Sequence, residues 1–68
     1  MTSGKTISEN IKKLRSMLSL TQDDLAKKAD LKYTTLMKVE SGTVNKPSVQ
    51  TMAKIAKALG VSIEELLK

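Results

Sequence analysis

The sequence of 68 residues contains no cysteine and no histidine, and it has no tryptophan or phenylalanine either. Without thiols the chain cannot form a disulfide, and without imidazoles it also lacks the other side chain that most often binds transition metals. We therefore expect no metal and no cofactor. A chain of this length forms one small domain, whose stability must come from a single apolar core, with or without self-association.

Long hydrophobic runs are also missing. No apolar stretch approaches the roughly 20 residues that a membrane-spanning helix needs. The opening segment, MTSGKTISEN, lacks the apolar centre of a secretory signal. These absences predict a cytoplasmic protein that makes no contact with a membrane.

Groups for catalysis are equally scarce. The sequence offers no cysteine or histidine for nucleophilic or acid–base chemistry, and no glycine-rich phosphate loop. Neighbouring carboxylates occur at Asp23 and Asp24 and again at Glu64 and Glu65, but both pairs stand at predicted helix starts, where capping accounts for them. We expect no enzymatic activity.

Acidic residues are outnumbered by basic ones, 7 against 12, which gives a net charge of +5 and a pI near 9.7. This balance favours a polyanionic partner, nucleic acid before membrane. The alternative is a basic domain with no such partner, and charge alone does not separate the two. The pattern of residues along the chain has to decide.

Apolar residues recur at helical spacing, and no segment alternates as a strand does, so the sequence predicts an all-α fold of five short helices. Residues 1–5 are expected to form a flexible arm, and residues 6–68 a single domain. A capping box at Thr6 and Glu9 is expected to open the first helix. Its apolar face is then formed by Ile7, Ile11, Leu14 and Leu18.

The later helices carry their own start and stop signals. Thr21 is predicted to cap the second helix and Ser48 the fourth, while Gly42 and Gly60 suit the left-handed position after a helix end. A capping box between Ser62 and Glu65 is expected to open the fifth. The predicted core face of the fourth helix comprises Val49, Met52, Ala53, Ile55, Ala56 and Leu59.

The second and third helices, residues 21–29 and about 32–40, are joined by a turn of about three residues. So short a link makes the helices cross steeply, as in a helix-turn-helix. The segment LTQDDLAKKADLKYTTLMKVESG indeed resembles the helix-turn-helix of lambda-repressor-like, Cro-type (XRE) domains, which read L-T-Q-x-x-L-A-x-x-x-G-[VL]-S-x-x-x-I-x-x-[IV]-E-x-G. The resemblance covers residues 6–67, because ENIKKLR and KPSVQTMAKIAKALGVSIEELL fit the family's other helices.

The sequence departs from the family pattern at two positions. Asp30 replaces the usual turn glycine, and aspartate tolerates a positive φ better than most residues. Lys32 replaces the usual serine cap of the third helix and cannot accept a hydrogen bond from a backbone N–H. Capping from Asp30 is left open as an alternative.

The resemblance implies that the third helix enters the major groove of DNA. Base contacts are then implied at Tyr33, Thr34 and Lys38, with Met37 as a candidate apolar contact. Alternatively, Tyr33 packs against the helix-turn-helix and Lys38 is simply solvated. Other lysines, among them Lys12, Lys27, Lys28, Lys54 and Lys57, are expected to be solvated.

Phosphate contacts are implied at two places. One is the start of the second helix, at Thr21 and Gln22, where the free N–H groups and the helix dipole favour an anion. The alternative there is that Thr21 is only a cap and Gln22 only a surface residue. The other is the loop before Pro47, at Thr43, Asn45 and Lys46.

The resemblance also implies structural roles for two further sets of residues. Arg15 and Glu40 match a largely buried ion pair between the first and third helices. The apolar residues of the last helix either form a dimer contact or close the monomer core. These residues are Ile63, Leu66 and Leu67.

Together these features predict a sequence-specific DNA-binding regulator, of the repressor kind, that acts as a homodimer on a palindromic operator. The expected partners are double-stranded DNA and a second copy of the chain, in a bacterial or phage-encoded, nucleoid-associated setting, and no small-molecule ligand is evident. The alternative is a protein-interaction module of the antitoxin or co-activator type, which uses the same fold and binds DNA only secondarily.

Overall fold

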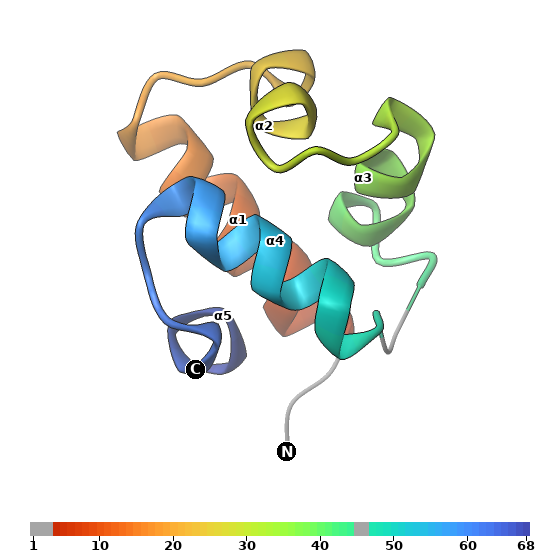
Figure 1. Cartoon of the computed structure of the whole chain (residues 1–68). Coiled ribbons are helices and arrows are strands. Elements are labelled where there is room, and N and C mark those ends of the chain that lie inside the picture. The colour runs from red at the N-terminus through yellow and green to blue at the C-terminus, as the bar shows by residue number, and fades with distance from the viewer. Residues whose placement is uncertain (1–3, 45–46) are drawn as a thin grey trace.

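The computed structural model describes residues 4–44 and 47–68. Within these ranges the chain forms five helices and no strand, which confirms the predicted all-α fold (Figure 1). The helices are α1 (Gly4–Met17), α2 (Gln22–Lys28), α3 (Tyr33–Glu40), α4 (Val49–Leu59) and α5 (Ile63–Leu67). None of these helices is long and apolar enough to cross a membrane.

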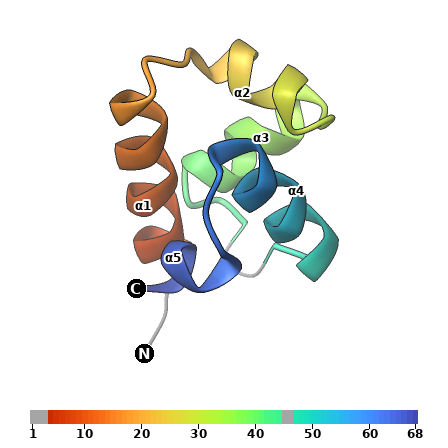
Figure 2. The same ribbon diagram turned by 60° about the vertical axis from the view of Figure 1, so that its left-hand side comes forward.

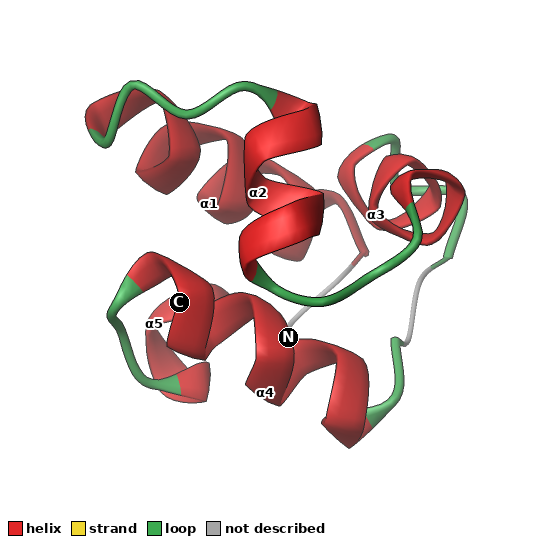
Figure 3. Ribbon diagram, turned by 45° about the horizontal axis from the view of Figure 1, so that its top comes forward, coloured by secondary structure: helices red, strands yellow, loops and turns green. Residues whose placement is uncertain are grey.

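The helices wrap around one centre. Helix α1 packs against α3 and α5, while α4 packs against α2 and α5. Figure 2 shows α5 lying against the first part of α1, which brings the C-terminal helix next to the N-terminal one. Helices α2 and α3 contact each other and cross steeply (Figure 3). This crossing is the one that the short link between them predicts.

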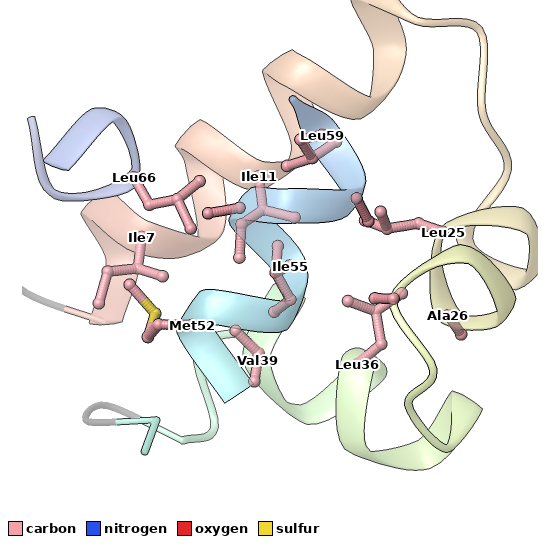
Figure 4. Packing of buried hydrophobic residues seen from close by; sticks show 13 residues of the cluster. Ile7, Ile11, Leu25, Ala26, Leu36, Val39, Met52, Ile55, Leu59 and Leu66 are labelled. Carbon is pink, nitrogen blue, oxygen red and sulfur yellow. The ribbon is translucent and has the colours of Figure 1, made fainter. Parts of the chain in front are cut away.

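Every helix contributes one side chain to the core that is completely shielded from solvent. These five side chains are Ile11, Leu25, Leu36, Ile55 and Leu66, each 0% exposed (Figure 4). At roughly 1.5–3 kcal/mol per fully buried large aliphatic side chain, they supply much of the apolar stabilisation of so small a domain. Since no helix has a core of its own, the five elements are stable only together.

The local signals at the helix ends largely behave as predicted. Ser48 accepts a hydrogen bond from the backbone N–H of Thr51 at 3.2 Å, and so caps α4. Gly60 ends that helix with a φ of 73°, and the N–H of Val61 reaches back to the carbonyl of Ala56 at 3.0 Å. This is the hydrogen bond expected of a Schellman-type helix end.

Helix α2 begins with a complete capping box. The hydroxyl of Thr21 accepts from the backbone N–H of Asp24 at 3.0 Å, and the carboxylate of Asp24 accepts from the N–H of Thr21, also at 3.0 Å. The hydrogen bond from the Thr21 backbone, then that from the Thr21 side chain, lower the pKa of Asp24 below its usual value of 3.8.

The lowered pKa makes a prediction about acid stability. A carboxyl group with a lower pKa in the folded state stabilises the fold above its unfolded pKa, and this contribution disappears as the pH falls through the folded value. The variant Asp24→Asn should therefore melt below the wild type at pH 7, and the difference should close as the pH falls below the usual value of 3.8 and through the lower folded-state pKa. Thermal unfolding followed by circular dichroism over this pH range measures the difference. Glu64→Gln is the control for the loss of one acidic charge, because it removes an exposed carboxylate that accepts no hydrogen bond in the described residues.

The predicted start and end of the first helix are wrong. Helix α1 begins at Gly4, inside the segment expected to form an arm, so Thr6 lies within the helix and is not its N-cap. Leu18 follows the last helical residue and is 48% exposed instead of lying on the buried face. The backbone turns away at Ser19, which has a φ of 55°.

The predicted core face of α4 is wrong at two positions. Val49 is 76% exposed, because it is the first residue of the helix and extends past the edge of the core. Ala53 is exposed too, whereas Ala58 is buried. The side of α4 that carries Ala58 faces α2, so contact with α2 shifts the buried stripe away from Ala53.

The predicted capping box of the last helix is also not formed. Ser62 occupies the N-cap position but its side chain makes no capping hydrogen bond. The carboxylate of Glu65 instead pairs with the ammonium of Lys68 at 2.8 Å. That pairing raises the pKa of Lys68 through its hydrogen bond to Glu65.

Candidate nucleic-acid interface

The turn between α2 and α3 is held by the backbone and by apolar packing. Asp30 has a φ of 56°, as the replacement of a turn glycine requires. The N–H of Leu31 donates to the carbonyl of Ala26 at 2.9 Å, which closes the turn onto α2. Beneath it, Leu25 and Leu36 are fully buried and fix the two helices against the core.

Lys32 is the N-cap residue of α3, and its side chain makes no capping hydrogen bond, as expected for a lysine. The alternative that Asp30 caps α3 is not realised, because no hydrogen bond joins the carboxylate of Asp30 to that helix in the described residues. Helix α3 is nevertheless formed from Tyr33 onward.

The outer face of α3 carries the polar residues for which the resemblance implies base contacts. Leu36 and Val39 are buried, so the opposite side of the helix faces solvent. Thr34 and Lys38 are exposed on that side, and Tyr33 is 47% exposed. Met37 is half-buried at the edge of the same face. The structure thus presents a polar surface on a helix that is anchored from beneath.

A hydrogen bond that the sequence analysis missed connects the starts of α2 and α3. The hydroxyl of Tyr33 donates to Oε1 of Gln22 at 3.3 Å. Only the steep crossing of α2 and α3 brings these two side chains together, and no local sequence pattern indicates such a pair. The contact uses only the amide oxygen of Gln22, and no hydrogen bond from its amide N–H groups occurs in the part of the chain that the structure describes.

The candidate phosphate-binding residues fall into two groups. Thr21 and Gln22 stand at the exposed start of α2, although the Thr21 hydroxyl is engaged in the capping box. Thr43 is exposed after α3, and its hydroxyl lies 2.8 Å from that of Ser41. Asn45 and Lys46 lie outside the described residues.

Arg15 lies at the junction of three segments. Its Nε is 3.1 Å from Oε1 of Glu40 on α3, and its Nη1 donates to the carbonyl of Leu20 at 3.0 Å, just before α2. The Glu40 side chain is 1% exposed, and within the described residues its second oxygen, Oε2, has no hydrogen-bond partner. Ser8 on α1 donates to the backbone carbonyl of the same residue. Glu40 is therefore a buried carboxylate with one cationic partner.

The three apolar residues of α5 differ in how deeply they are buried. Leu66 is 0% exposed, which agrees with the alternative that it closes the monomer core. Ile63 is partly buried against that core, whereas Leu67 is 39% exposed. The amide of Asn10 on α1 donates to the carbonyl of Leu66 at 2.9 Å and so holds α5 in place.

The lysines near the helix-turn-helix differ in whether they have a carboxylate partner. Lys27 lies 3.0 Å from Asp23, and the hydrogen bond to that carboxylate raises the pKa of Lys27. Lys28 and Lys38 form no ion pair in the described part of the chain. Within the same residues, no group of three or more acidic side chains is arranged to hold a metal.

Comparisons with known proteins agree with this geometry. The chain is 41% identical over 56 residues to an uncharacterized HTH-type transcriptional regulator of Methanocaldococcus jannaschii, a match that covers 82% of this chain and 83% of that protein. It is 36% identical over 62 residues to the immunity repressor protein of Bacillus phage phi105, covering 91% of this chain and 42% of the repressor.

Solved structures share the fold. The structure of SinR, the master regulator for biofilm formation, in complex with DNA has a TM-score of 0.86 and 31% identity, over 91% of this chain and 98% of that one. The restriction-modification controller protein C.AhdI from Aeromonas hydrophila also has a TM-score of 0.86, at 27% identity, over 93% of this chain and 94% of that one. The signature of the Helix-turn-helix family matches residues 11–66. The chain therefore belongs to the helix-turn-helix family of DNA-binding transcription regulators, of the lambda-repressor-like (XRE) type.

Proposed function

We propose that this protein binds double-stranded DNA sequence-specifically as a transcriptional repressor, with α3 in the major groove. The observation that carries the proposal is the outer face of α3, where Tyr33, Thr34 and Lys38 face solvent while Leu36 and Val39 anchor the helix. A helix anchored in this way can present its polar side chains to base edges without rearrangement. The net charge of +5 favours approach to DNA.

Each exposed side chain has a definite chemistry toward bases. The ammonium of Lys38 donates to guanine O6 and N7, and the Thr34 hydroxyl bonds in either direction while its methyl contacts a thymine methyl. The hydroxyl of Tyr33 donates to Gln22, and we assign the tyrosine ring to the wall of the groove. Met37, half-buried at the edge, adds an apolar contact.

Phosphates position the domain without reading sequence. The free amide N–H groups of Gln22 are placed to donate to a phosphate at the start of α2, where backbone N–H groups and the helix dipole also favour an anion. Thr21 supports this site as the cap of the helix. On the other side of α3, we assign the same role to Thr43, Asn45 and Lys46.

We further propose that the protein acts as a homodimer on a palindromic operator with half-sites about 34–36 Å apart. The phi105 relative, an immunity repressor, supports the assignment as a repressor. Leu67 is the exposed apolar residue of α5, and Ile63 beside it is only partly buried. We therefore assign the dimer contact to these two residues.

Selection of bound sites from random duplex DNA tests the function. We expect a palindromic consensus. The variant Lys38→Ala should lose sequence preference at one base position in each half-site, with a loss of about 1–3 kcal/mol in the binding free energy that separates the preferred base from the others. Lys46→Ala should lower the affinity for all DNA sequences alike. It should also reduce the slope of log affinity against log salt concentration by about 1.

Lys12→Ala is the matched control, because it removes one exposed lysine from α1 to which we assign no DNA contact. It should leave the consensus unchanged. If the selection enriches no sequence at either of two salt concentrations, the repressor proposal fails. Tight capture of one protein partner would then favour the interaction module.

A further inference from the structure

A hollow lies at the opposite end of α2 from the proposed phosphate site. It has a volume of about 430 Å³ and lies between the C-terminal end of α2 and the outer side of α4. Its lining residues are Lys28, Ala29, Asp30, Lys54, Lys57 and Ala58. Ala29 and Ala58 are 4% and 5% exposed, and their small side chains let the two helices approach closely beneath the rim. The hollow is open to solvent on one side.

The rim of this hollow is strongly cationic. Lys28 comes from α2, Lys54 and Lys57 come from α4, and the one carboxylate beside them belongs to Asp30. None of the three lysines forms an ion pair in the described residues, whereas Lys27, one position before Lys28, is paired with Asp23.

Lys54 also connects α4 to the helix-turn-helix. Its ammonium lies 3.4 Å from the backbone carbonyl of Asp30, the turn residue with a φ of 56°. At this distance the hydrogen bond is weak, so an anion is a better partner for the ammonium. The lysine thus already extends across the hollow.

The hollow is separate from the proposed DNA surface. Gln22 begins α2 and Lys28 ends it, and a helix of that length spans about 10 Å. Lys38 and Thr34 lie on α3, which does not line the hollow.

We propose that this hollow, bounded by Lys28, Lys54 and Lys57, binds a small anion that carries two or more linked phosphates. A multiply charged ligand suits three lysines that line one hollow from two helices, and lysine binds phosphate as a compact point charge. Binding would hold the turn of the helix-turn-helix against α4, and a ligand that binds only the folded state stabilises it. The inference does not depend on the proposed DNA sequence specificity.

Titration of the isotopically labelled protein with inorganic tripolyphosphate, followed by amide chemical shifts, tests the site. We expect saturable shifts in residues 28–30 and 54–58. The double variant Lys54→Gln/Lys57→Gln should bind about tenfold more weakly, as expected for the loss of two charge contacts. Lys12→Gln/Lys13→Gln removes the same charge from exposed positions of α1, and it should weaken binding by no more than about twofold.

Three outcomes would overturn the inference. The first is an equal loss of affinity in the two double variants, which would mean that only net charge matters. The second is a set of shifts confined to the start of α2 and to α3, which would place the anion on the DNA surface. The third is contact of these lysines with duplex DNA or an acidic peptide but not with tripolyphosphate. Circular dichroism of each variant without ligand checks that its fold is intact.

Discussion

Replacing Arg15 with alanine is expected to lower the free energy of unfolding by about 3–5 kcal/mol. The substitution leaves Glu40, which is 1% exposed, as a buried carboxylate without a cation. One of its oxygens has no hydrogen-bond partner among residues 4–44 and 47–68, so no second donor there compensates. A domain of this length has a total stability of about 3–10 kcal/mol, so much of the population should unfold. Urea denaturation monitored by circular dichroism measures the loss.

Two further variants separate the effect of an unpaired buried charge from the effect of losing the hydrogen bonds of the Arg15 guanidinium. The double replacement Arg15→Met/Glu40→Leu removes the buried charge altogether and should recover most of the lost stability. Arg15→Lys keeps the charge but cannot reach both Glu40 and the carbonyl of Leu20 with a planar fork, so its stability should lie between those of the wild type and Arg15→Ala. A loss below about 1 kcal/mol for Arg15→Ala would show that the pair behaves as an ordinary surface pair.

The second large effect is expected for Leu36→Ala, at about 2–5 kcal/mol of lost stability. Leu36 is 0% exposed and is the fully buried side chain of α3, so its removal opens a cavity beneath that helix. Because α3 carries the proposed base contacts, DNA binding should fall together with the folded fraction. Thermal unfolding and a binding titration on the same sample measure both.

Val49→Ala provides the matched comparison. It also shortens an aliphatic side chain, but at a position that is 76% exposed, so the stability should change by less than about 0.5 kcal/mol. Similar losses in the two variants would contradict the core described for this fold. The same comparison tests the finding that Val49 does not belong to the buried face of α4.

The sequence alone was sufficient to predict the features that depend on residues close to one another in the chain. The caps at Thr21 and Ser48 each join residues three positions apart, and a pattern of such range can be read directly from the chain. The glycine end at Gly60 and the positive φ of Asp30 are local in the same sense. The resemblance to the family also implies the pair of Arg15 and Glu40, which no local pattern indicates.

The tertiary structure alone decided which distant residues meet. Contact with α2 buries Ala58 instead of Ala53, and the steep crossing of α2 and α3 brings Tyr33 to Gln22. The same packing collects Lys28, Lys54 and Lys57 around one hollow, although each alone looks like a solvated lysine. The physical reason is that helical spacing fixes which residues share a face of one helix, whereas burial and pairing depend on the neighbouring helix that covers that face.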